Sequence, residues 1–207
     1  MKPFIGMLSL NISLVLYLIN YIPQLWHNKI DRHISGLSFY FHCLFLLSYL
    51  TDLIYALGCH MQWQYCLVSV IGMVYLFIQH GQIKNAITAQ SFLVINCLLT
   101  LTIFLGVFFL CLEKHHGVIF IIMGYFSRVT GWIAFFPQIV KNIKSSTALS
   151  LSALYLIIDL ACKLCDNVSA WILSWPMPSK LGAIFSIVIC SILIFQKYKF
   201  YYVNQRI

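Results

Sequence analysis

Two stretches of this sequence read almost alike: YIPQLWHNKIDRHISGLSFYF at residues 21–41 and FFPQIVKNIKSSTALSLSALY at residues 135–155. Each contains a Pro-Gln pair, an asparagine four residues after the glutamine, then basic and small polar residues, and a Leu-Ser pair. The second copy begins 114 residues after the first. Internal repetition of this kind indicates a chain built from two similar units.

The composition is that of a membrane protein. Of the 207 residues, 61% are hydrophobic and only 9% are charged, and the mean hydropathy is +0.89. A soluble domain carries about 25% charged residues, so an ordinary water-soluble globule is excluded. The net charge of +8 does not indicate nucleic-acid binding, because the 13 Lys and Arg residues are scattered singly between apolar runs.

Seven apolar stretches are long enough to cross a hydrocarbon core of ~30 Å. We therefore predict an all-α membrane protein that forms a single transmembrane domain over residues 1–207. The duplicated motif divides it into two parallel three-helix repeats, 4–83 and 117–197, joined by a linker helix within 91–112, a 3+1+3 arrangement. The predicted helices cover 4–22, 37–57, 64–83, 92–112, 117–136, 149–173 and 181–196.

The basic residues between the predicted helices give the orientation. Eight of them lie on one side of the membrane and three on the other. The excess of positive charge on cytosolic loops then places the C-terminus in the cytosol and the N-terminus outside the cell or in an organelle lumen. The eight are Lys29, Arg32, Lys84, Lys141, Lys144, Lys197, Lys199 and Arg206, and the three are Lys2, Lys114 and Lys180.

The two Pro-Gln pairs are predicted hinges, each placed where a helix ends before a basic loop. Pro23 and Pro137 lack a backbone donor and disturb the preceding helical turn. The carbonyls that lose a donor need another partner in lipid, and the amides of Gln24 and Gln138 can supply it. A single Pro-Gln pair is also compatible with an ordinary helix end, but two copies in the same context favour the hinge.

Five charged side chains lie inside predicted helices, where an ionised group costs roughly 2.5 to 3.5 kcal/mol. Asp159, Lys163 and Asp166 share one narrow face of the sixth helix at about 100° per residue, so that face cannot point at lipid. Arg128 lies in the fifth helix, and Asp52 lies in the second at the position that corresponds to Asp166. The charges form either a functional site or structural ion pairs, Asp159 with Lys163 and Arg128 with Asp166 or Asp52.

The duplicated motif in a seven-helix chain of this size resembles the PQ-loop family, which includes cystinosin and the vacuolar cationic amino acid transporters. SWEET sugar carriers and the KDEL receptor share the wider fold. The resemblance covers about residues 4–200 and implies alternating access between two rocking repeats. In cystinosin-like proteins an aspartate 21 residues after the second Pro-Gln glutamine is implicated in proton coupling, and Asp159 matches that position. The chain departs from the family at Tyr40, which replaces an acidic residue after GLSF.

The predicted function is a proton-coupled transporter of amino acids or cystine. A carboxylate in a partly dry cavity has its charged form penalised, so it can take up a proton from the acidic side. Buried cations near the site favour a carboxylate-bearing solute over a purely cationic one. The predicted proton-coupling residues are Asp159, Asp166 and Asp52, and the predicted substrate contacts are Lys163, Arg128 and Tyr40.

Two other functions stay open: a facilitative sugar carrier of the SWEET type, which needs no buried charge, and a receptor of the KDEL type, which captures a peptide carboxylate with buried basic residues. We expect no enzyme activity, cofactor or metal site, because no nucleophile and base and no cluster of metal ligands occur at a plausible spacing. The expected partners are a small solute, protons and the lipid bilayer, without nucleic acid; a homo-oligomer is compatible. A bacterial inner membrane is favoured over a lysosomal or vacuolar one, since the C-terminal stretch KYKFYYVNQRI has no clear tyrosine-based lysosomal signal.

Overall fold

The computed structural model describes residues 2–30, 39–83, 102, 103, 105, 106, 117–146, 148 and 151–204. In this part of the chain every regular element is a helix. Most of the predicted linker helix at 91–112 lies outside the described residues. The helices are α1 (Lys2–Asn20), α2 (Ile22–Ile30), α3 (Phe39–Gly58), α4 (Trp63–Ile83), α6 (Gly117–Ser145), α7 (Ala153–Ile172) and α8 (Met177–Asn204).

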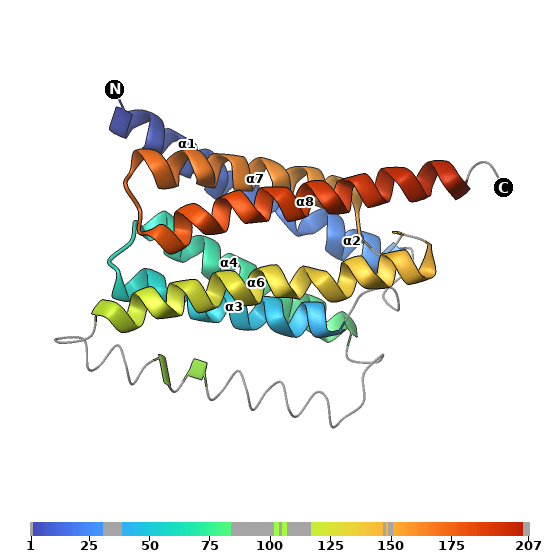
Figure 1. Ribbon diagram of the computed structural model, residues 1–207, viewed down its shortest axis with the longest axis horizontal. Helices are drawn as coiled ribbons and strands as arrows, with labels where there is room; N and C mark the ends of the chain where they lie inside the picture. Colours follow the sequence, from blue (N-terminus) through green and yellow to red (C-terminus); the bar gives the residue numbers. More distant parts are fainter. Residues whose placement is uncertain are drawn as a thin grey trace.

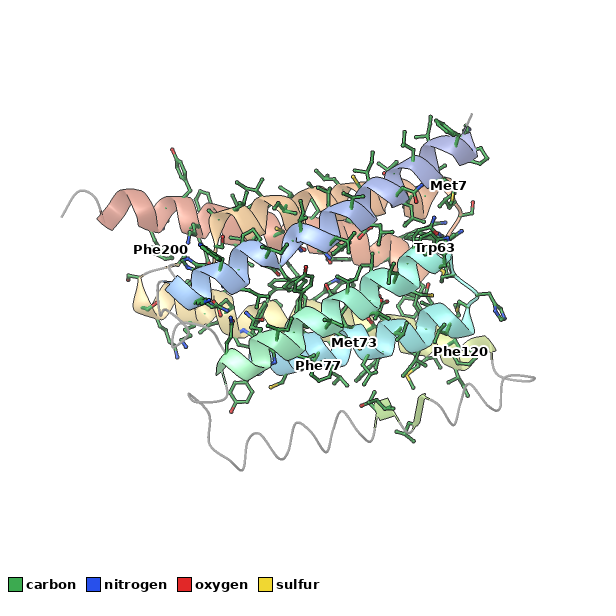
Figure 2. All side chains as sticks on the ribbon, turned by 180° about the vertical axis from the view of Figure 1, so that it is seen from behind. Met7, Trp63, Met73, Phe77, Phe120 and Phe200 are labelled. Atoms are coloured by element: carbon green, nitrogen blue, oxygen red, sulfur yellow. The ribbon has the colours of Figure 1, made fainter. Side chains whose placement is uncertain are left out.

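The helices lie side by side along one common direction (Figure 1). α1, α4, α6 and α8 begin at the same end of the bundle, and α3 and α7 run the opposite way. Figure 2 shows Met7, Trp63 and Phe120 near that end and Phe200 at the other. Most described basic residues outside the central charges lie within α2, α6 and α8, towards the ends where these helices finish, and we call this the basic end. They are Lys29, Lys141, Lys144, Lys197 and Lys199, while Lys2 and Lys180 lie at the opposite end.

Each half of the chain packs mainly on the other half. α3 packs along α6, and α1 packs along α7, more extensively than any other pair of described helices. Between α3 and α6, Ser48 Oγ donates to the Ser127 carbonyl at 2.8 Å and Ser127 Oγ donates to the Ser48 carbonyl at 2.9 Å. A Cβ at Gly131 would lie 2.9 Å from Ser48 Oγ. Small side chains therefore let these two helices approach closely, as in other membrane bundles.

Four described helical segments are long and apolar enough to cross a membrane: Lys2–Lys29, Tyr40–Gly58, Gly117–Ser145 and Met177–Phe200. α4 contributes a shorter apolar stretch, Trp63–Gln79. α7 has 20 residues, as α3 does, but it carries the three charges predicted for the sixth helix. With these apolar helices the chain is an integral, multi-pass membrane protein.

The bundle is apolar outside and partly polar inside. Large apolar side chains such as Val15, Ile122 and Phe195 are 59%, 59% and 63% exposed. Buried side chains include serines, glutamines, asparagines and two of the charged residues. In water the opposite distribution is favoured, whereas lipid favours apolar groups on the outer surface and requires polar groups to find partners within the protein.

The fifth helix is predicted to end at residue 136, but α6 continues past Pro137 to Ser145, which corrects that helix end. The first helix is predicted to end at residue 22, and α1 ends at Asn20; Pro23 belongs to a separate helix, α2, from Ile22 to Ile30. Proline removes a single backbone donor, and the helical hydrogen bonding resumes at once, since Leu25 N donates to the Tyr21 carbonyl at 2.9 Å. The last helix also exceeds its predicted end, because α8 continues from residue 196 to Asn204.

Candidate functional site

A cavity of about 80 Å³ lies between the helices, and we call it the central cavity. By general criteria this volume holds several water molecules. Its wall contains side chains from α1, α3, α4, α6, α7 and α8, so both halves of the chain contribute. Four charged residues line it: Asp52, Arg128, Lys163 and Asp166.

On one wall, α3 and α6 contribute an ion pair between Arg128 Nη2 and Asp52 Oδ1. Hydroxyl groups of α4 complete the coordination of the carboxylate: Tyr65 OH donates to Asp52 Oδ1 at 2.9 Å, and Ser69 Oγ donates to Asp52 Oδ2 at 3.0 Å. The Arg128 side chain lies directly on the α8 backbone, where a Cβ at Gly182 would come within 2.3 Å of Arg128 Cδ. The pair is therefore held by four helices.

On the opposite wall, α1 and α7 contribute a second set of polar contacts. Ser13 Oγ and Tyr17 OH donate to the two oxygens of Asp166, at 2.5 Å and 2.9 Å. Lys163 Nζ donates to Tyr17 OH at 2.5 Å and lies 3.7 Å from Asp159 Oδ1. Asp166 is thus coordinated by hydroxyl groups of the first half of the chain, as Asp52 is paired with a guanidinium of the second half.

The two Pro-Gln motifs make equivalent hydrogen bonds at the basic end. Gln24 Nε2 donates to Asn28 Oδ1 at 2.8 Å, and the Asn28 amide donates to Gln82 Oε1 of α4 at 3.0 Å. The second copy repeats this pattern: Gln138 Nε2 donates to Asn142 Oδ1 at 2.9 Å, and the Asn142 amide donates to Gln196 Oε1 of α8 at 3.2 Å. The asparagine four residues after each glutamine therefore ties the first helix of each half to its third.

The first motif also reaches the other half of the chain. Gln24 Oε1 accepts a hydrogen bond from the backbone nitrogen of Ser152 at 2.8 Å. Ser152 is the N-cap residue of α7, and its side chain accepts from Tyr155 N. Gln24 therefore fixes the start of the helix that carries Asp159, Lys163 and Asp166.

Comparison with protein families finds a match in the first half of the chain. Residues 5–65, which hold most of α1, all of α2 and α3 and the start of α4, match the family model described as PQ loop repeat. No curated protein matches the chain. The PQ-loop repeat holds Pro23, Gln24 and Asp52, and the second motif, at Pro137 and Gln138, reproduces its Gln-Asn hydrogen bond outside the matched residues.

The structure brings four of the six predicted charged or substrate-contacting residues to the central cavity and leaves two outside its wall. Asp159 is 4% exposed and buried behind Lys163, although the two make the predicted i,i+4 pair. Of the two partners considered for Arg128, Asp52 is the one that it pairs with. Tyr40 is 70% exposed near the start of α3 and is not among the cavity-lining residues.

Sequence reasoning missed the tyrosines that hold the carboxylates. Tyr17 and Tyr65 both line the central cavity and donate to Asp166 and Asp52, respectively. A tyrosine in an apolar helix is read as a packing residue, because its ring is apolar and its hydroxyl adds no charge. One signal could have found Tyr17: with Ser13 and Asn20 it forms a polar stripe at helical spacing along α1.

Aromatic side chains separate the central cavity from a second, smaller one towards the PQ-loop glutamine. The second cavity, of about 10 Å³, is lined by Tyr21, Gln24 and Tyr155 among others. Tyr21 OH and Tyr49 OH lie 3.0 Å apart, and Phe45 and Phe135 cross edge to face with ring centroids 5.0 Å apart. We call Phe45, Tyr49, Phe135 and Tyr21 the aromatic layer; it closes the central cavity on this side.

We expect Gln24→Leu in the PQ-loop repeat to destabilise the protein by about 1–3 kcal/mol, because it leaves a buried backbone N–H of Ser152 without its acceptor. The readout is the thermal unfolding midpoint in detergent micelles. Gln64→Leu is the matched control, since Gln64 is also buried and its amide donates to the Asn11 side chain at 3.1 Å, but its Oε1 accepts from no backbone N–H within the described structure. Equal losses in the two variants would show that Gln24 makes no special contribution.

Proposed function

We propose that the chain is a carrier, and not an enzyme, that moves a carboxylate-bearing solute such as an amino acid or cystine by alternating access, coupled to protons. In this proposal seven helices form two parallel PQ-loop repeats around a linker helix. The N-terminus faces the outside or a lumen and the basic end faces the cytosol, in a bacterial inner membrane in preference to a lysosomal or vacuolar one. Protons act at Asp159, Asp166 and Asp52.

The observation that carries the proposal is that the polar contacts of the central cavity join the two halves of the chain. Asp52 of the first half pairs with Arg128 of the second, and Asp166 of the second half is bound by Ser13 and Tyr17 of the first. Movement of one half against the other must stretch or break these contacts. Protonation or solute binding that replaces them would therefore favour the movement, as alternating access requires.

Two orphaned donors support a solute with a hydrogen-bond acceptor. Arg128 Nε and Trp132 Nε1, one turn apart on α6, belong to side chains that line the central cavity, and both are buried without a hydrogen-bond partner within the described structure. A buried donor left unpaired costs about 1–3 kcal/mol. A carboxylate or carbonyl oxygen of the solute, reached after a small side-chain adjustment, would remove this cost and favours a carboxylate-bearing solute.

The size of the central cavity supports a closed conformation. Pockets that bind small molecules typically enclose roughly 300–1,000 Å³, and this cavity has about 80 Å³. The aromatic layer shuts it off from the PQ-loop glutamine. Entry of an amino acid therefore requires the halves to separate, and at the basic end such separation would break the hydrogen bond from Ser152 N to Gln24 Oε1.

The test is uptake of radiolabelled amino acids and cystine into proteoliposomes, with and without an inward proton gradient and with a protonophore as control. We expect at least one amino acid to be taken up faster under the gradient and the protonophore to remove the difference. The matched substrate control is the amide of that amino acid, which lacks the carboxylate and should be carried poorly.

Either of two results would overturn this proposal and identify a different function. Glucose exchange that ignores the gradient, without amino acid uptake, would identify a facilitative sugar carrier. Binding of a peptide carboxylate at acidic pH without flux of any solute would identify a receptor, which the partly buried Arg128 and Lys163 would serve.

A further inference from the structure

One ion pair and two hydrogen bonds link the buried aspartate of α7 to the aspartate in the central cavity. Asp159 Oδ1 lies 3.7 Å from Lys163 Nζ, Lys163 Nζ donates to Tyr17 OH at 2.5 Å, and Tyr17 OH donates to Asp166 Oδ2 at 2.9 Å. The hydrogen bonds point in one direction, from Lys163 through Tyr17 to Asp166. A charge change at one aspartate can therefore reach the other.

Asp159 lies between the two cavities and lines neither of them. It is 4% exposed, while Tyr155, four residues earlier on α7, lines the second cavity, and Lys163 and Asp166 line the central one. A proton that enters the central cavity meets Asp166 but has no direct access to Asp159. Lys163 contacts Asp159 and Tyr17 contacts Asp166, so a route through side chains uses these two residues in series.

We propose that Tyr17 is a proton relay between Asp159 and Asp166; this inference rests on the proposed proton-coupled carrier. The Tyr17 hydroxyl gives its proton to Asp166 and receives one from Lys163 Nζ, and Lys163 receives one from protonated Asp159. One O–H bond is lost at Asp159 and one forms at Asp166, while Tyr17 and Lys163 end as they began. The reverse sequence carries a proton from Asp166 to Asp159.

Tyr17 is suited to this role by its chemistry and its place. A phenol both donates and accepts a hydrogen bond, whereas a lysine ammonium only donates. Ser13 donates to Asp166, but no contact of the described side chains joins it to Lys163. The other titratable or charged groups near the two aspartates come from every neighbouring helix: Tyr21, Tyr49, Arg128, Tyr155, Cys162, Cys165 and Cys190.

The relay crosses the interface between the halves, which links proton transfer to conformation. Lys163 and Asp166 belong to α7, and Tyr17 belongs to α1. Separation of α1 from α7 would break the chain at both of its hydrogen bonds. The second repeat has no equivalent of Tyr17. The repeats are offset by 114 residues, and the residue 114 positions after Tyr17 is Gly131, which has no side chain.

The experiment compares Tyr17→Phe with Tyr75→Phe in proteoliposomes. Tyr75 OH donates to the Leu18 carbonyl of α1 at 2.5 Å, so the control removes a tyrosine hydroxyl bound to the backbone of the residue next to Tyr17 and not to an aspartate. The measured quantity is the ratio of gradient-driven uptake to solute exchange at equal pH, with exchange also reporting that the protein is folded. We expect this ratio to fall at least about tenfold in Tyr17→Phe and to keep its wild-type value in Tyr75→Phe.

The outcomes separate the relay from the function on which it rests. An unchanged ratio in Tyr17→Phe, whether both fluxes persist or both fall together, would overturn the relay and leave the carrier intact. A wild-type protein whose uptake ignores the gradient would overturn the proposed function and the relay with it. Asp159→Asn with a lost gradient response, alongside Tyr17→Phe with a normal one, would assign coupling to Asp159 by another route and also overturn the relay.

Discussion

Asp159→Asn is expected to abolish the response of uptake to a proton gradient, lowering gradient-driven flux to the rate seen without a gradient. The amide has nearly the shape of the carboxyl group but cannot bind and release a proton. The contacts run from Asp166 in the central cavity through Tyr17 and Lys163 to Asp159. Without the Asp159 carboxylate, a proton that reaches Lys163 from the cavity has no further acceptor. Initial uptake rates in proteoliposomes at several external pH values would measure the loss.

The same substitution leaves Lys163 as a buried cation without its carboxylate partner. Breaking a buried ion pair on one side costs about 3–5 kcal/mol, so the single variant should also unfold at lower temperature. The double variant Asp159→Asn with Lys163→Met removes both charges; it should regain most of the stability and still fail to respond to the gradient. A double variant that regains the gradient response would show that Asp159 and Lys163 form only a structural pair.

The assembly of four charges around one cavity was predictable from the sequence, because physical costs leave few alternatives. Charged side chains could not face lipid, which applies to Asp52, Arg128, Lys163 and Asp166. The two aspartates lie at the same distance from the Pro-Gln glutamine of their own unit, so they occupy corresponding positions. In the structure both aspartates line the same cavity. Charge in a membrane segment is therefore a strong guide to which face is buried.

The ends of the helices, and the uncharged side chains that bind the charged ones, are harder to predict from the sequence. The sequence predicts a helix end at Pro137, but α6 continues to Ser145, because the loss of one donor is a small local cost when Gln138 and Asn142 bond across the next turn. Tyr40 was chosen by its position relative to a family motif, and position alone does not say which way a side chain points. Tyr17 was missed because its ring is apolar, and only its neighbours in three dimensions reveal what the hydroxyl does.

Arg128→Met is expected to be among the most destabilising substitutions in the bundle, at about 3 kcal/mol. The carboxylate of Asp52, whose side chain is 10% exposed, would lose the cation that pairs with it. The estimate takes the low end of the 3–5 kcal/mol range for a broken buried pair, because Tyr65 and Ser69 still donate to Asp52. The thermal unfolding midpoint in detergent micelles is the measurement.

Lys180→Met is the matched control, since Lys180 contacts Trp171 at the opposite end of the bundle without a buried partner charge; it should cost no more than about 0.5 kcal/mol. The double variant Arg128→Met with Asp52→Asn should return close to wild-type stability, as replacement of a whole buried pair often does. If that stable double variant also loses affinity for the amino acid, Arg128 contacts the solute and its charge serves more than the fold. If it binds and carries the solute as the wild type does, the pair is structural, and recognition of the carboxylate falls to other donors on the wall, Lys163 and Trp132.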